Sequence, residues 1–125
     1  MKELSEAEWN VMESLWEASP KVGSQIVSDM VKRTGWSRST TLTMLRRMTD
    51  KGLVACVDNG KMKTYTPLIE RKTAVKKETE SFLNRVYHGS ISMLINGFVE
   101  RQRLSPKELL ELRQILDRAE EGEHD

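Results

Sequence analysis

The stretch from Trp36 to Val54, WSRSTTLTMLRRMTDKGLV, decides the fold. It predicts a helix over residues 38–51, because Ser37 is a suitable N-terminal cap and Gly52 can end the helix in a left-handed conformation. One face of this helix repeats at helical spacing and is suited to pack on a core; its members are Thr41, Met44, Leu45 and Met48. The opposite face carries hydroxyl and guanidinium groups. What this polar face contacts is the main question about function.

Two further helices are predicted before this stretch. The sequence SEAE at residues 5–8 is a capping box, in which Ser5 and Glu8 cap the N-terminus of a helix together, and Pro20 stops that helix. The sequence VGSQIVSDMVKRTG predicts the second helix, which ends at Gly35. The expected core residues of the two helices are Val11, Met12, Leu15, Trp16, Ile26, Val27, Met30 and Val31.

A β-hairpin is predicted directly after the third helix. The segment LVACVD is rich in β-branched residues, KMKTYT alternates, and Asn59-Gly60 between them favours a two-residue turn. Residues 1–69 therefore indicate three helices followed by a hairpin, which is the order of a winged helix-turn-helix domain. In that fold residues 38–51 form the recognition helix and residues 58–66 form a basic wing.

The remainder of the chain, residues 70–125, is predicted to be helical, so the fold class is mainly α with a small β-hairpin. Gly89 and Gly97 are expected to interrupt the first amphipathic stretch, and Ser105-Pro106-Lys107-Glu108 starts another helix. Because these helices have little of their own to pack on, we expect a dimerisation region, with EEGEHD as a frayed acidic tail. The residues expected to contact a second copy are Phe82, Val86, Leu94, Ile95, Phe98, Leu109, Leu112, Ile115 and Leu116.

Composition limits the remaining possibilities. The chain has 125 residues, enough for one domain or for one small domain with an appendage. No apolar run approaches the ~20 residues that span a bilayer. The N-terminus, MKELSEAEWN, does not resemble a secretory signal, so we expect a cytoplasmic protein without membrane insertion. Cys56 is the single cysteine, which excludes a disulfide within one chain; we expect a buried thiol, with redox sensing as the alternative.

The net charge of +1 hides an uneven distribution of charged residues. Residues 1–17 contain one lysine and five glutamates, whereas residues 32–63 contain eight basic residues and two aspartates. Acidic residues are therefore scarce where basic residues gather, which indicates a surface that binds a polyanion rather than a face of paired charges. Double-stranded DNA is the partner that such a surface predicts on a winged-helix domain.

Candidate DNA contacts divide into those to phosphates and those to bases. Phosphate contacts are expected from cationic side chains of the third helix and the hairpin, although Lys61 and Lys63 have a second interpretation as charges that protect an edge strand. Base contacts are expected from hydroxyl side chains early in the helix, where threonines can instead bond to their own helix. Leu42 lies off the apolar stripe, so we expect it to be exposed and to contact thymine methyl groups. The predicted DNA-binding residues are Ser37, Arg38, Ser39, Thr40, Leu42, Thr43, Arg46, Arg47, Lys51, Lys61 and Lys63.

Other conspicuous residues are assigned to structural roles. Trp9, Trp16 and Trp36 are expected to pack in the core rather than to stack on bases, and His88 lacks partners at metal-ligand spacing. The sequence has no phosphate-binding loop, no HExxH motif and no serine–histidine–acid set. We therefore expect no metal, no cofactor and no enzymatic activity.

These motifs together resemble the BlaI/MecI family of winged-helix transcriptional repressors, the penicillinase repressors, over essentially the whole chain. The resemblance is carried by SEAEWNVMESLW, WSRSTTLTMLRRMTDKGLV, NGKMKTYTPL, FLNRVYHGS, FVE and LSPKELLELRQIL, in this order. It implies a homodimer that binds palindromic operator DNA and blocks transcription. Relatives commonly carry a basic residue near the position of Leu42, so the resemblance does not extend to the operator sequence.

The resemblance also implies a mode of induction. In one branch of the family a membrane sensor of β-lactams triggers cleavage of the repressor, and the corresponding position here is Gly97-Phe98, where relatives usually have asparagine before phenylalanine. A bend between two helices is the alternative interpretation of Gly97. A copper-responsive branch carries a C-terminal cysteine cluster that this chain lacks, since EEGEHD offers only His124 as a soft ligand.

A winged-helix module that binds an acidic protein without reading DNA sequence is the alternative function, because fold alone does not separate the two. The hydroxyl and arginine side chains of the third helix favour DNA, as does the basic hairpin, since protein interfaces usually present aromatic or aliphatic anchors. We therefore expect a transcriptional repressor rather than an interaction module.

Overall fold

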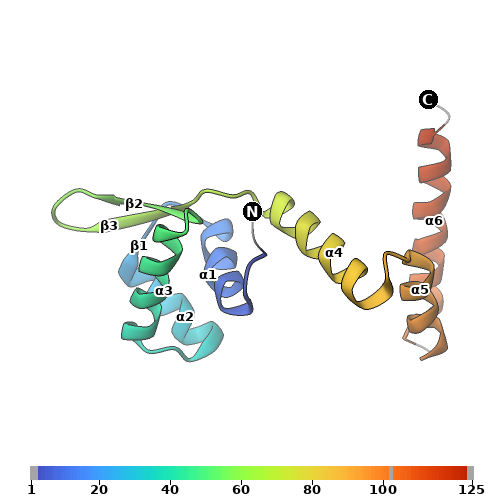
Figure 1. Ribbon diagram of the computed structural model, residues 1–125, viewed down its shortest axis with the longest axis horizontal. Helices are drawn as coiled ribbons and strands as arrows, with labels where there is room; N and C mark the ends of the chain where they lie inside the picture. The colour runs from blue at the N-terminus through green and yellow to red at the C-terminus, as the bar shows by residue number, and fades with distance from the viewer. Residues whose placement is uncertain (1–2, 102, 124–125) are drawn as a thin grey trace. The chain divides into compact units, whose positions relative to one another are not determined.

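The computed structural model describes residues 3–101 and 103–123 (Figure 1). Along the chain lie the elements α1 (Glu6–Glu17), β1 (Lys21–Val22), α2 (Gly23–Thr34), α3 (Arg38–Asp50), β2 (Val54–Asp58), β3 (Lys63–Pro67), α4 (Arg71–Tyr87), α5 (Ile91–Glu100) and α6 (Pro106–Glu123). The predicted fold class, mainly α with a small β-hairpin, is confirmed.

The chain forms two compact units, Met1–Thr79 and Glu80–Asp125, and the division between them falls inside α4. The sequence placed this boundary at residues 69 and 70, before the helix begins. The difference has a physical reason, because the first turns of α4 belong to the first unit. Ala74 is 2% exposed in the core of that unit, and Arg71 Nε donates to Glu13 Oε1 of α1 at 2.8 Å.

The third helix, α3, has the caps and the buried stripe that its sequence predicts. Ser37 Oγ accepts a hydrogen bond from the backbone N–H of Thr40 at 3.1 Å, and Gly52 follows the helix with φ of 79°. The helix ends at Asp50 with Lys51 as its C-terminal cap, one residue earlier than expected. Its stripe is confirmed: Thr41, Leu45 and Met48 are fully buried, and Met44 packs partly buried against the core.

The first two helices complete the core of the first unit. The predicted capping box of α1 is present, since Ser5 Oγ accepts from the Glu8 N–H at 3.1 Å and Glu8 Oε1 accepts from the Ser5 N–H at 2.8 Å. In α2, Ile26 and Met30 are fully buried, but Val31 is 54% exposed, so its assignment to the core is wrong. At 3.6 residues per turn, Val31 lies about 120° round the helix from the middle of the Ile26–Met30 stripe.

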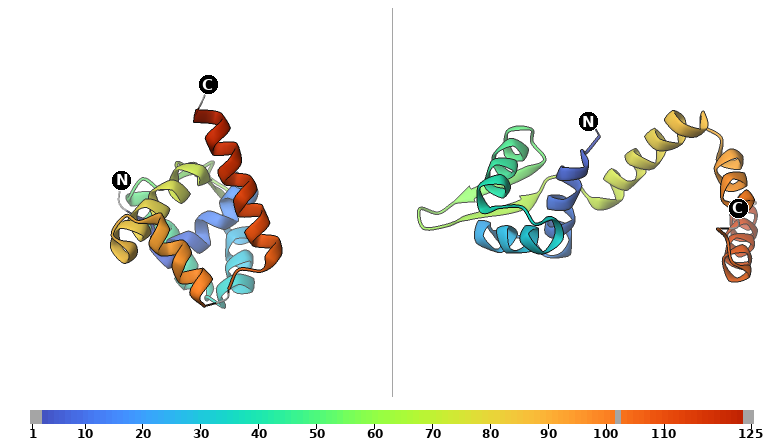
Figure 2. Two further views of the ribbon diagram at one scale, coloured as in Figure 1. Left: turned by 90° about the vertical axis from the view of Figure 1, so that its right-hand side faces the viewer. Right: turned by 90° about the horizontal axis from the view of Figure 1, so that it is seen from below.

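The sheet contains one strand more than the sequence predicted. Its order is β1-β3-β2 with antiparallel neighbours, so the short strand β1 covers the second edge of β3 at Thr64 and Tyr65 (Figure 1). The hairpin between β2 and β3 projects beyond the three helices (Figure 2, right). The sequence missed β1 because two residues after a proline give no alternation that a pattern can detect.

The hairpin turn is longer than predicted. Asp58 pairs with Lys63, so residues 59–62 form a four-residue loop rather than a two-residue turn at Asn59-Gly60. Side-chain oxygens stabilise the longer loop, because Asp58 Oδ1 accepts from the Gly60 N–H at 2.9 Å and Asn59 Oδ1 accepts from two backbone N–H groups further on. The loop gains two residues, an even number, so the faces of the strands remain as the alternation predicted.

The second unit contains the end of α4 together with α5 and α6. His88, with φ of 51°, and Gly89, with φ of 81°, end α4 as the expected break near Gly89 requires. The second expected break is wrong, because α5 continues through Gly97 to Glu100 and no bend between helices occurs there. Ser105 and Glu108 form the predicted cap of α6, with the reciprocal bonds at 3.1 and 3.0 Å.

The acidic C-terminus is helical as far as it is described. Helix α6 extends to Glu123, so the expected frayed tail is wrong for residues 120–123, where Glu120 and Glu121 favour a helix and no stop precedes Gly122. Residues 124 and 125, including His124, lie outside the described residues. In the described part of the chain, no helix combines the length and the apolar character needed to cross a membrane.

The three tryptophans lie where the sequence placed them. Trp9, Trp16 and Trp36 are partly buried against the core, and the rings of Trp9 and Trp16 meet edge to face at 5.5 Å. Trp16 Nε1 also donates to the backbone oxygen of Ile69 at 2.9 Å, which ties the end of the hairpin segment to α1. The core interpretation of the tryptophans is therefore confirmed.

Candidate nucleic-acid interface

The polar side of α3 faces away from the core. Ser39, Thr40, Arg46 and Arg47 are exposed and Thr43 is half-buried. Leu42 is 37% exposed, which agrees with its expected position off the stripe. This side of the helix therefore offers hydroxyl groups, one leucine and two guanidinium groups to a partner.

The hydroxyl groups at the start of α3 differ in how far they are already engaged. Ser37 Oγ donates to Thr40 Oγ1 at 3.0 Å and also caps the helix by accepting from the Thr40 backbone N–H. Bonding back to the helix backbone occurs for Thr41, to the Ser37 oxygen at 3.2 Å, and for Thr49, to the Leu45 oxygen at 2.7 Å. Among the described residues no such bond is made by Thr40 or Thr43, the two threonines among the predicted base contacts.

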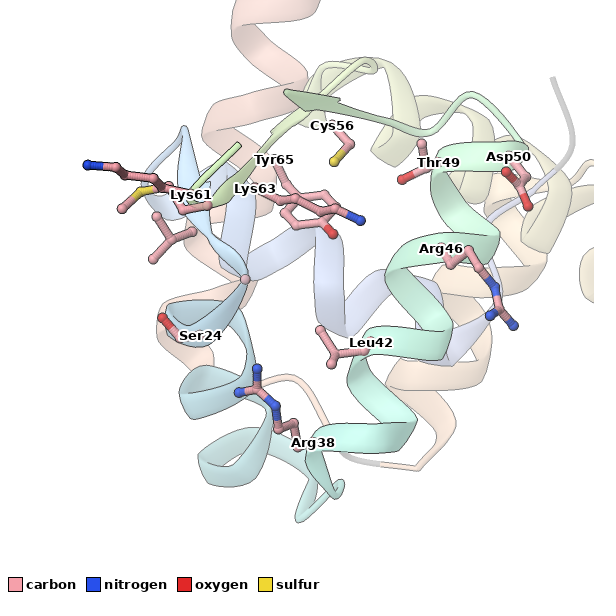
Figure 3. A pocket seen from close by; sticks show the side chains of 13 residues that line it. Ser24, Arg38, Leu42, Arg46, Thr49, Asp50, Cys56, Lys61, Lys63 and Tyr65 are labelled. Atoms are coloured by element: carbon pink, nitrogen blue, oxygen red, sulfur yellow. The ribbon is translucent and has the colours of Figure 1, made fainter. Parts of the chain in front are cut away.

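A hollow of 610 Å³ separates α3 from the hairpin (Figure 3). Its walls are one side of α3, the start of α2, the strands β2 and β3 and the loop between these strands. The residues lining it are Val22, Gly23, Ser24, Arg38, Leu42, Arg46, Thr49, Asp50, Cys56, Lys61, Met62, Lys63 and Tyr65. The structure thus brings five of the predicted DNA-binding residues, from two separate segments, around one concave surface.

Five exposed cations of α3 and the wing, of which all but Arg47 line this hollow, form no ion pair with a carboxylate of the described residues. No ion pair within residues 3–101 and 103–123 involves Arg38, Arg46, Arg47, Lys61 or Lys63. Asp50 is the acidic residue of the lining, but cations without an ion pair still attract a polyanion. The charge asymmetry of the sequence therefore corresponds to an unpaired cationic surface, which comprises these five residues.

Lys51 differs from these cations. Its Nζ lies 2.8 Å from Glu8 Oε2, and the Glu8 side chain is 5% exposed. Burial favours the protonated form of Glu8, but hydrogen bonds from Lys51 and Ser5 outweigh burial and hold the pKa of the carboxyl below its usual value. The sequence predicted a phosphate contact for Lys51, but its ion pair with Glu8 sets it apart from the unpaired cationic surface.

The two wing lysines do not lie on an edge strand. Lys61 is in the loop at residues 59–62, and Lys63 begins β3, the central strand of the sheet. Because β1 pairs only with Thr64 and Tyr65, the second edge of β3 is open at Lys63, so protection of that edge stays the alternative interpretation of Lys63. Figure 3 shows the Lys63 side chain extending into the hollow above Tyr65, whereas Lys61 points away from α3.

Tyr65 and Cys56 form the floor of the hollow and were missed as site residues in the sequence. They are cross-strand partners, and both side chains face the hollow (Figure 3). Burial raises the pKa of the Tyr65 hydroxyl, and a hydrogen bond with Cys56 and the nearby Asp58 carboxylate raise it further. Cys56 is half-buried at this floor rather than fully buried as expected. The signal was present in the alternation of the two strands, but it needed the true hairpin register.

The described residues contain no cluster of three or more histidine, cysteine, aspartate or glutamate side chains suited to hold a metal ion.

Three helices lie beside a β-hairpin with a cationic tip, and the third helix is capped and presents one polar, exposed face. This arrangement defines a winged helix-turn-helix domain.

The sequence places the chain within one family of such domains. Residues 4–118 match the family described as penicillinase repressor, and the chain belongs to that family. The family consists of transcriptional repressors rather than enzymes, as we expected. The penicillinase repressor of Bacillus licheniformis is 34% identical over 115 residues, which cover 92% of this chain and 90% of that protein.

Two further relatives agree with this assignment. The methicillin resistance regulatory protein MecI of Staphylococcus aureus (strain N315) is 33% identical over 116 residues, which cover 93% of this chain and 94% of that protein. The solution structure of the DNA-binding domain of the repressor BlaI superposes with a TM-score of 0.51 at 32% identity. It covers 54% of this chain and 83% of that domain. The predicted winged-helix fold is confirmed by this likeness.

Proposed function

We propose that the protein is a homodimeric transcriptional repressor that binds palindromic operator DNA. The observation that supports this most directly is the unpaired cationic surface, to which α3 contributes Arg38, Arg46 and Arg47 and the wing contributes Lys61 and Lys63. The relatives named above are repressors, and one of them has a DNA-binding domain of the same fold. A surface of this charge meets the phosphate backbone without losing ion pairs of its own.

In the proposed complex α3 lies in the major groove. Ser39, Thr40, Leu42 and Thr43 face base edges, with Leu42 against thymine methyl groups. The cations of α3 contact phosphates, and the wing follows the backbone or the minor groove beside it. Ser37 lies at the start of α3, where its hydroxyl caps the helix. It directly precedes Arg38, the first cation proposed to contact a phosphate.

A second copy of the chain covers the apolar side chains of the second unit. None of the described side chains of residues 80–122 is buried. Several large apolar side chains are 39 to 60% exposed: Phe82, Val86, Phe98, Ile115 and Leu116. Three helices with apolar faces and no buried core gain stability by packing on another surface. The same surface on a second copy can serve as that packing partner. Two copies joined in this way have the two-fold symmetry that a palindromic operator requires.

Relief of repression is proposed to proceed by cleavage of Gly97-Phe98, through a membrane sensor-protease pathway such as the family resemblance implies. Both residues lie inside α5, so a protease gains access only when this helix opens locally. A glycine inside a helix costs about 1 kcal/mol relative to alanine, which favours such opening. Intact protein in the induced native host would contradict cleavage and leave the DNA-binding proposal standing.

Selection of duplexes from a random pool at two salt concentrations tests the central proposal. We expect an enriched palindrome with half-sites about one helical turn apart, and weaker recovery at the higher salt concentration. Sedimentation of the same full-length protein measures its oligomeric state. A pool without enrichment, together with capture of an acidic protein partner, would favour the interaction-module alternative.

A further inference from the structure

The hollow between α3 and the hairpin combines two chemistries. Its lining is partly apolar: Tyr65, 7% exposed, and Cys56 form the floor, and Leu42 of α3, 37% exposed, extends into the hollow (Figure 3). Its rim is cationic, with Arg38 on one side and Lys63 on the other. DNA phosphates account for the cations, but they do not account for the apolar side chains between them.

The start of α2 adds a third component to the hollow. Its N-cap residue, Val22, provides no side-chain cap, so the N–H groups of the first turn are not capped by a side chain. Val22, Gly23 and Ser24 line the hollow, and uncapped first-turn N–H groups carry a partial positive charge equivalent to about half an elementary charge. Figure 3 shows the Arg38 side chain extending from α3 toward this end of α2. The arginine and the helix start therefore converge on the same part of the hollow.

The volume of the hollow, 610 Å³, falls within the range of roughly 300–1,000 Å³ that is typical of small-molecule sites. We propose that it binds a small organic anion, in which a phosphate or carboxylate lies between Arg38, Lys63 and the start of α2, and a ring or short chain lies on Leu42 and Tyr65. Free anions and DNA phosphates share the first of these chemistries. The apolar body distinguishes the small ligand from the DNA backbone.

The bound anion competes with DNA. Arg38, Leu42 and Lys63 belong both to this site and to the surface proposed for the operator, so one position cannot serve both ligands at once. This consequence rests on the proposed function, whereas binding of the anion itself does not. The site would give the repressor a reversible response to a metabolite that leaves the chain intact.

A titration of the isotope-labelled full-length protein, followed by amide chemical shifts, tests the site. The probes are phenyl phosphate, inorganic phosphate and benzyl alcohol at constant ionic strength, which separate the anionic group from the ring. We expect phenyl phosphate to bind at least about tenfold more tightly than either of the other two, because ring burial adds to the ionic contact. Its shifts should centre on Gly23, Ser24 and Tyr65. Equal binding of phenyl phosphate and inorganic phosphate would overturn the apolar part of the site.

Two variants locate the anion. We expect Arg38→Gln to weaken phenyl phosphate about tenfold, because a charge-assisted contact is lost. The matched control, Lys72→Gln, removes an exposed cation from α4, away from the hollow, and should leave the affinity unchanged. Equal weakening by both variants would show general charge attraction and would overturn the site.

Displacement of a labelled operator duplex by the same probes separates this inference from the proposed function. At fixed ionic strength phenyl phosphate should displace the duplex at a concentration at which inorganic phosphate does not. A protein that binds the duplex but not phenyl phosphate would overturn the inference alone. Failure to bind any duplex would overturn the proposed function, and phenyl phosphate binding without displacement would overturn the competition.

Discussion

The two units of this chain contain similar helices but bury their apolar side chains to very different degrees. In the first unit, Leu15, Ile26, Leu45 and Met48 are fully buried around a three-helix core closed by the sheet. In the second unit, no described side chain is buried, and Leu116 is 60% exposed. Both patterns arise from amphipathic helices. The difference shows that an apolar face becomes a core only when the same chain supplies its partner.

Removal of the second unit is expected to have the largest effect. A chain ending at Thr79 should fold as a monomer and bind the operator about 10² to 10⁴-fold more weakly, because the two half-sites are no longer linked. Fluorescence anisotropy measures the affinity, and sedimentation measures the mass.

A shorter truncation provides the control for this deletion. A chain ending at Ile69 lacks Ala74, whose side chain is 2% exposed in the first core, and should be less stable than the chain ending at Thr79. A truncated protein that remains dimeric would place the interface in the first unit and reverse the comparison.

A pair of leucine substitutions tests the same contrast within the intact chain. Leu45→Ala removes a fully buried side chain and should lower the free energy of unfolding by about 2–5 kcal/mol at any protein concentration. Leu116→Ala should instead change stability in a concentration-dependent way, because its partner in the proposed dimer is a second copy. Urea denaturation at two protein concentrations makes both measurements. A Leu116→Ala effect independent of concentration would contradict the proposed interface.

The sequence predicted the first unit well because its signals are local. The capping box at Ser5, the cap at Ser37 and the stripe of α3 each depend on residues within one or two turns. The strand β1 and the four-residue loop were not predicted, since both depend on pairing with β3 across the sheet. The loop also depends on the side-chain oxygens of Asp58 and Asn59, which accept hydrogen bonds from the backbone N–H groups of Gly60 and Lys61.

The sequence indicated which residues belong to the site, but it did not indicate which other side chains they contact. Arg46 and Lys61 are unpaired cations around the hollow, as the scarcity of nearby acids indicated. Lys51 has the same sequence context, yet it pairs with Glu8, 43 positions earlier in the chain. A contact at this sequence separation follows from the packing of α1 on the end of α3 and leaves no periodic signal. Cys56 and Tyr65 were missed as a pair for a similar reason.

Substitution should affect DNA binding differently for the unpaired cations and for the cation that is paired with Glu8. Arg46→Ala and Lys61→Ala should each weaken binding to all duplexes and reduce the slope of log affinity against log salt by about 0.9, because one phosphate contact is lost. Lys51→Ala should leave the slope nearly unchanged, since its charge is paired with Glu8. Anisotropy titrations at several salt concentrations measure the slopes. An unchanged slope in both of the first two variants would remove the phosphate assignment.

The smallest expected effect concerns the link between α1 and α3. Glu8→Gln keeps the side-chain size but loses the charge that accepts from Lys51, and should cost about 1 kcal/mol of stability at neutral pH. The folded-state pKa of Glu8 lies below the ordinary value of 4.5, so its stabilising contribution is present above pH 4.5 and is lost as the pH falls through the folded pKa.

The stability of the wild type should therefore approach that of Glu8→Gln as the pH falls below 4.5. Urea midpoints measured at neutral pH and at a series of acidic values test this, with the chain ending at Thr79 as the background. In that chain the second unit contributes no titrating carboxylates and no dimer. A gap between the two proteins that stays constant with pH would show that the carboxylate charge does not support the position of α3, and only the shape of the side chain would remain as the link.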